Sequence, residues 1–156
     1  MKIRLLAVGM RQPAWVQAGY EEYARRMPAQ YRLELIELPC ARRRGKEDVK
    51  RLLAEEGRHM SAAIQDKDRV IALDERGLSW RTSELAQHLA RWSQDGRNLT
   101  LLIGGPDGLD VHCLTRADLR WSLSALTLPH GLVRVLVAEQ LYRAMSLLQG
   151  HPYHRE

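Results

Sequence analysis

The fold is decided by the stretch Leu99-Thr100-Leu101-Leu102-Ile103-Gly104-Gly105-Pro106-Asp107-Gly108. Its first half is a short apolar run, typical of a buried strand, and its second half is a glycine-rich turn. Open α/β folds bind ligands at the carboxyl ends of such strands, so the stretch predicts a pocket. The two adjacent glycines either form an ordinary turn or let a ligand approach the backbone.

A second segment returns to the same neighbourhood. The run Trp121-Ser122-Leu123-Ser124-Ala125-Leu126-Thr127-Leu128-Pro129-His130 alternates small residues with leucines. It is either a strand with small outward residues or a loop whose backbone reads the edge of a purine between leucines. A helix over Leu132–Met145 with few polar positions follows. The convergence of both segments ahead of this helix predicts the active site.

The remaining chain alternates strands and helices. Apolar runs predict strands at Ile3–Val8 and at Val70–Asp74, with a turn at Glu75–Gly77 closing the latter. The two-residue period of Tyr31–Leu38 predicts a half-exposed strand near a sheet edge. The helices expected between them are Pro13–Arg26 with Trp15 on its apolar side, Glu47–Ile64 with Val49 on its buried face, and Ser83–Trp92. This order predicts one α/β domain over residues 1–156, a mostly parallel sheet with helices on both faces.

The composition of the 156 residues is that of an ordinary globular protein with a net charge of +5. The sequence pI of about 9.6 favours an anionic partner such as nucleic acid. Cys40 and Cys113 have no metal-ligand spacing, so we expect no metal. No run reaches the roughly 18 apolar residues of a membrane span, and the N-terminus does not have the pattern of a signal peptide. We therefore expect a cytoplasmic protein without a membrane partner.

Glu139 and Arg143 lie four residues apart on the last helix and should pair there. The last six residues, His151–Glu156, form a tail that combines ionisable and aromatic groups. The tail is either a disordered end or a segment that holds RNA and handles a proton. The last helix is apolar around most of its circumference, which predicts a homodimer with this helix in or beside the interface.

The chain resembles the bacterial ribosomal RNA large subunit methyltransferase H family over its whole length. The specific segments are Leu102–Gly108, Trp121–His130, Leu132–Ala144 and His151–Glu156, with looser matches at Ala7–Gly9, Trp15–Gln17 and Leu73–Asp74. The resemblance implies the knotted SPOUT class, with a C-terminal trefoil knot, a homodimer, and S-adenosylmethionine as the cofactor. It also implies methylation of N3 of a pseudouridine in 23S ribosomal RNA, on the large subunit or the assembled ribosome.

The resemblance also assigns residues to the site. The family's cofactor contacts correspond to Leu73, Gly104, Leu123, Ser124, Ala125, Leu126, Thr127 and Leu128. The expected catalytic residues are His154 as the base, with Asp107, Glu139 or water as alternatives, and Tyr153, Arg155 and Arg143 around the RNA. From their charge alone, Arg42, Arg43, Arg44, Lys46, Arg4 and Arg11 are either RNA backbone contacts or ordinary solvated surface residues.

Two other functions fit the same sequence. One is a non-enzymatic, basic α/β factor that binds RNA or the ribosome, in which the glycine turn is only a turn. The other is a SPOUT methyltransferase that acts on another RNA. Stabilisation that rises with S-adenosylmethionine concentration separates an enzyme from the non-enzymatic factor.

Overall fold

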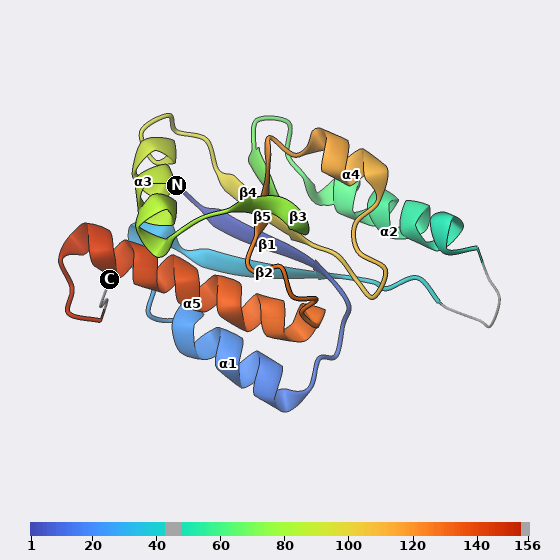
Figure 1. Cartoon of the computed structure of the whole chain (residues 1–156), viewed down its shortest axis with the longest axis horizontal. Helices are drawn as coiled ribbons and strands as arrows, with labels where there is room; N and C mark the ends of the chain where they lie inside the picture. The colour runs from blue at the N-terminus through green and yellow to red at the C-terminus, as the bar shows by residue number, and fades with distance from the viewer. Residues whose placement is uncertain (43–47, 154–156) are drawn as a thin grey trace.

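The structure is a computed structural model that describes residues 1–42 and 48–153. Its strands and helices alternate along the chain, as the sequence predicts (Figure 1). In order they are β1 (Ile3–Val8), α1 (Ala14–Ala24), the short 3-10 helix η1 (Ala29–Tyr31), β2 (Leu33–Leu38), α2 (Val49–Ala63), β3 (Arg69–Ser79), α3 (Thr82–Trp92), β4 (Leu99–Ile103), α4 (Val111–Arg116), β5 (Leu119–Ser122) and α5 (His130–Gln149).

The strands form one parallel sheet in the order β2-β1-β4-β3-β5. β1 and β4 are buried along their whole length, because a central parallel strand is covered on both faces and needs a continuous apolar run. β2 lies at an edge, where Leu33 and Leu38 are buried and Glu34 is exposed. The predicted edge position of this strand is therefore confirmed.

Helices cover both faces of the sheet, which confirms the predicted α/β architecture (Figure 1). Ile3, Leu5 and Ala7 of β1 belong to a core shared with α1, α3 and α5. Leu6 and Val8, which point to the opposite face, belong to a core with α2 and α4. The two cores follow from the two-residue period of a strand, which sends successive side chains to opposite faces.

A buried polar group closes the amino edge of the sheet. Arg4 Nη1 lies 3.1 Å from Asp68 Oδ2, and the same oxygen accepts the Thr100 hydroxyl at 2.8 Å. Arg4 also donates through Nη2 to the Ala63 carbonyl at 2.7 Å. Since its guanidinium is buried and fully engaged, the expected role of Arg4 as an RNA backbone contact is wrong.

Several local predictions differ from the structure. Glu75–Gly77 is not a closing turn but an irregular part of β3, which shifts register between Leu73 and Leu78 and then pairs again with β5. A Cβ atom on Gly77 would lie 2.6 Å from the Arg120 carbonyl oxygen, so only glycine permits this approach. Trp15 is 59% exposed and Val49 is 47% exposed, although both were expected on the buried, apolar faces of their helices.

The last helix, α5, packs against α1 and α3 within the same chain (Figure 1). Residues Val137, Ala138, Leu141, Ala144 and Met145 form its fully buried face. A second, half-buried face carries Leu132, Val135, Leu136, Glu139 and Arg143. The chain thus covers more of this helix than its apolar sequence suggested. The homodimer stays a prediction, and so does the trefoil knot.

Candidate functional site

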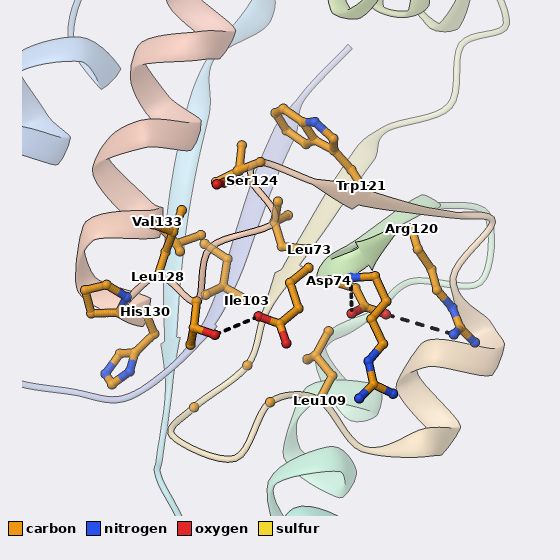
Figure 2. A pocket seen from close by; sticks show the side chains of 18 of the residues that line it. Leu73, Asp74, Ile103, Leu109, Arg120, Trp121, Ser124, Leu128, His130 and Val133 are labelled. Atoms are coloured by element: carbon orange, nitrogen blue, oxygen red, sulfur yellow. Dashed lines mark hydrogen bonds and ion pairs between the residues drawn. The ribbon is translucent and has the colours of Figure 1, made fainter. Parts of the chain in front are cut away.

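A cavity of about 810 Å³ opens at the carboxyl edge of the sheet, where the sequence predicts a pocket. Its walls come from the middle of β3, the end of β4, β5, the loops that follow β4 and β5, one residue of α4, and the first turn of α5. Figure 2 shows Leu128, His130 and Val133 on one side of this cavity and Asp74 and Arg120 on the other. The lining residues are Leu73–Arg76, Ile103–Leu109, Leu114, Arg120, Trp121, Leu123, Ser124, Leu126–His130 and Val133.

The glycine turn after β4 is folded tightly on itself. A Cβ atom on Gly104 would lie 2.3 Å from the Gly108 carbonyl oxygen, so no other residue permits the observed turn. Gly105 and Gly108 form an isolated bridge, and Gly108 adopts a φ of 85°, in the left-handed region that favours glycine. The turn itself therefore requires glycine at 104, and its backbone lines the cavity.

The segment after β5 is a loop, so its interpretation as a strand with small outward residues is wrong. The loop is shaped by its own hydroxyl groups: Ser122 donates to the Ser124 carbonyl, and Ser124 Oγ accepts the Leu126 amide, both at 3.0 Å. Within the described part of the chain, the amides of Ala125, Thr127 and Leu128 make no hydrogen bond. Their N–H groups are therefore available to a ligand.

The first turn of α5 is anchored by a buried arginine. Arg134 is 1% exposed, and its Nη1 lies 2.7 Å from Glu37 Oε2 on β2. Its Nη2 donates to the carbonyl of Gly9, after β1, also at 2.7 Å. Sequence reasoning assigned Arg134 no role, although a single arginine between Val133 and Val135 in an apolar helix indicates a buried partner.

His130 begins α5 and lines the cavity. Burial lowers its pKa below the ordinary value, and the nearby Arg134 guanidinium lowers it further. The imidazole therefore favours its neutral form and can donate or accept a hydrogen bond at the cavity wall. Sequence reasoning included His130 in a motif but did not place it at the site.

The residues predicted to bind the cofactor are largely gathered at this cavity. Leu73, Gly104, Leu123, Ser124, Leu126, Thr127 and Leu128 line it, while Ala125 is an exposed residue of the same loop. Thr127 Oγ1 donates to Glu75 Oε2 at 3.1 Å, so the loop is tied to the irregular part of β3. Asp107, an alternative base, lines the cavity as well.

Two of the predicted catalytic residues, Arg143 and Tyr153, do not line this cavity in the same chain. Arg143 Nη2 lies 2.6 Å from Glu139 Oε1, which confirms the predicted pairing of these two residues. The Tyr153 hydroxyl donates to the same oxygen at 3.0 Å, and the Arg143 guanidinium lies 4.8 Å from the centre of the Tyr153 ring. Burial and the Glu139 hydrogen bond raise the pKa of Tyr153 to about 12, so its hydroxyl stays protonated.

This tail cluster of Glu139, Arg143 and Tyr153 is separated from the chain's own cavity by the length of α5. Val133 lines the cavity, and ten residues of helix, about 15 Å, separate it from Arg143. His154 and Arg155 lie outside the described residues, as do Arg43, Arg44 and Lys46. The other two expected RNA contacts, Arg11 and Arg42, are exposed.

In residues 1–42 and 48–153, no group of three or more histidine, cysteine or acidic side chains could hold a metal ion. Across the same residues, no helix is both long and apolar enough to cross a membrane.

Comparisons with known proteins agree with one another over most of the chain. Residues 1–154 match the family described as "Predicted SPOUT methyltransferase". Two proteins named "Ribosomal RNA large subunit methyltransferase H" are similar over nearly their whole length. The one from Alkalilimnicola ehrlichii is 59% identical, covering 99% of both chains. The one from Saccharophagus degradans is 57% identical, covering 99% of this chain and 100% of the relative.

Solved structures share the fold at low sequence identity. A probable methylase family protein from Haemophilus influenzae has a TM-score of 0.58 at 16% identity, covering 99% of this chain and 70% of that one. A probable methyltransferase from Bordetella pertussis has a TM-score of 0.56 at 15% identity, covering 92% of this chain and 95% of that one.

Proposed function

Since the chain belongs to the SPOUT methyltransferase family, we propose that it methylates N3 of a pseudouridine in large-subunit ribosomal RNA with S-adenosylmethionine. The observation that carries this proposal is the identity of 52–59% to three proteins named ribosomal RNA large subunit methyltransferase H, over 99% or more of this chain. The proposed substrate places the enzyme in the cytoplasm, with the ribosome as its partner.

The cavity at the carboxyl edge fits S-adenosylmethionine in size and chemistry. Its volume of about 810 Å³ lies in the range of small-molecule sites. Leu123, Leu126 and Leu128 offer apolar cover for a flat purine, and the unbonded amides of the same loop offer donors to its edge. When bound, the cofactor supplies a methyl group already activated by a sulfonium sulfur. The chain therefore has mainly to position the acceptor nitrogen in line with that methyl group.

We infer that the tail works in the cavity of a second copy of the chain. Arg143 lies too far along α5 to reach its own cavity, and Tyr153, which follows α5, contacts Glu139 and Arg143. Arg143 shares the half-buried face of α5 with Leu132 and Leu136. A homodimer that covers this face removes apolar side chains from water and brings the tail cluster to the interface. The proposed active site thus combines the cavity of one protomer with the tail of its partner.

The acceptor nitrogen of the uracil ring has to lose a proton, and His154 is the proposed base. Glu139 is less suited to this role, because its two oxygens already accept Arg143, Tyr153 and Gln140. It instead holds the Arg143 guanidinium and the Tyr153 hydroxyl in place. Arg143 and Arg155 then stabilise negative charge as it develops on the ring oxygens.

The direct test pairs donor binding with methyl transfer. Calorimetry should show binding of S-adenosylmethionine, and tritiated methyl groups should appear in the RNA of ribosomes that lack this modification. Donor binding without transfer to any ribosomal particle would favour a SPOUT enzyme that acts on another RNA. Ribosome binding without donor binding would contradict the proposal and identify a non-enzymatic factor.

A further inference from the structure

Four arginines at the amino edge of the sheet lie close to carboxylates. Each sits near the start of a strand or in the segment that leads into one, and an aspartate lies within ion-pair distance of each. The pairs are Arg4–Asp68, Arg69–Asp95, Arg97–Asp118 and Arg116–Asp118. These four guanidinium groups share three carboxylates, because Asp118 lies near both Arg97 and Arg116, so most of their positive charge is offset close by.

Two arginines at the mouth of the cavity, on the opposite edge, are engaged differently. Arg76 is exposed, and among the described residues its side chain makes no hydrogen bond or ion pair. Arg120 Nη1 lies 4.0 Å from Asp74 Oδ2, an ion-pair distance similar to those of Arg97 and Arg116. Those two guanidinium groups also donate to the Asp68 carbonyl, whereas the Arg120 guanidinium makes no hydrogen bond within the described residues. The Arg76 and Arg120 guanidinium groups therefore keep their N–H donors available, and both line the cavity.

Three carboxylates, those of Asp74, Glu75 and Asp107, line the same cavity. The Asp74 side chain is 18% exposed and that of Arg120 is 49% exposed, so the guanidinium is the outer member of this pair. Asp74 also accepts the backbone amide of Arg76 at 3.0 Å. Glu75 accepts the Thr127 hydroxyl, and Asp107 is engaged as well. Three carboxylates therefore line the cavity beside two guanidinium groups, and Arg76 and Arg120 are its exposed cationic side chains.

We propose that Arg76 and Arg120 bind the RNA phosphates that flank the nucleotide entering the cavity. A base that enters a pocket keeps its own backbone phosphates outside the mouth, beside whatever side chains line the rim. Guanidinium groups match phosphate in charge and in fork geometry. This inference rests on the proposed function, since it concerns the substrate of that same site, and it assigns a substrate-positioning role to two residues of the rim.

The test is methyl transfer to ribosomes by the full-length chain carrying Arg76→Gln and Arg120→Gln together. We expect kcat/KM for ribosomes to fall roughly tenfold at low salt, mainly through KM, because two charge-assisted contacts are lost. The salt dependence should also weaken, by about one unit of log–log slope for each phosphate contact removed. S-adenosylmethionine affinity should be unchanged.

The matched control is the Arg25→Gln, Arg32→Gln double variant, which removes the same charge from exposed positions near the amino edge. Its activity and salt slope should equal those of the unaltered chain. Equal losses of kcat/KM in both double variants would show that net charge alone causes the effect, which would overturn the assignment. A loss of donor affinity in the rim variant would place the guanidinium groups on the cofactor, which also overturns it. Failure of the unaltered chain to methylate ribosomes would instead contradict the proposed function.

Discussion

Replacement of Arg134 by methionine tests whether the cavity depends on a fixed first turn of α5. The arginine joins this turn to Glu37 on β2 and to the Gly9 carbonyl after β1, through two contacts of 2.7 Å each. Methionine fills a similar volume without either contact. The His130 and Val133 side chains, which line the cavity on the same turn, then lose their support.

The expected cost follows from these two contacts. A hydrogen bond from a charged donor contributes about 1.5–3 kcal/mol, so the pair sets an upper limit of roughly twice that value. The net loss is smaller, because the Glu37 side chain is 32% exposed and regains water, and because the variant buries no charge. We expect the free energy of unfolding to fall by about 3 kcal/mol and Tm to fall by roughly 6–12 °C.

Urea unfolding and calorimetry with S-adenosylmethionine measure the two consequences separately. Donor affinity should fall at least about tenfold, which corresponds to roughly 1.4 kcal/mol, and Arg134→Lys should recover part of it by restoring one charged donor. Arg4→Met is the matched control, because it removes an equally engaged buried arginine at the opposite edge and should lower stability alone. Equal donor affinity in the two methionine variants would refute the anchoring role of Arg134.

Three further predictions concern the turn, the tail and a titration. Gly104→Val should abolish donor binding and lower Tm together, since its side chain would collide with the Gly108 carbonyl; normal affinity by calorimetry would contradict this. Deletion of Tyr153–Glu156 should preserve dimer mass and donor affinity but reduce tritiated methyl transfer by orders of magnitude. Full activity of the truncated chain would show that the tail takes no part in methyl transfer. The lowered pKa of His130 means that the unfolded chain binds more protons, so the free energy of unfolding should fall as pH drops below about 6.5. The decline should be shallower in His130→Asn, and an unchanged urea profile would contradict the assignment.

Continuous apolar runs made the centre of the fold predictable. β1 and β4 are buried on both faces and are apolar except for Arg4 and Thr100, so their composition and length indicate central strands. The segment Glu75–Gly77 misled because its composition is that of a turn, whereas its conformation depends on pairing with β5 far along the chain. β5 itself is only four residues long and has a mixed pattern, so local sequence alone could not separate it from a loop.

The same contrast holds at the site. The cavity could be predicted, because carboxyl ends of parallel strands meet at one edge whatever the side chains are. The role of Arg4 could not be predicted, since a charged residue is expected at the surface. Its burial depends on contacts with the Asp68 carboxylate, which also binds Thr100, and both partners are distant in the sequence. The separation of Tyr153 from the chain's own cavity depends on the length and direction of α5, which residue types do not encode.

The order of the strands constrains how the chain can fold during its own synthesis. β1 pairs with β2, which follows soon after it, but its other edge pairs with β4, where Ile3 meets Leu99. At translation rates of about 5–20 residues per second, that edge of β1 waits roughly 5–20 seconds for its partner strand to be made. During this interval β1, which is apolar except for Arg4, has an unpaired edge, the feature that promotes association between chains. We therefore expect that covering this edge of β1 until β4 has been made limits association between nascent chains at the ribosome, the same particle on which the finished enzyme is proposed to act.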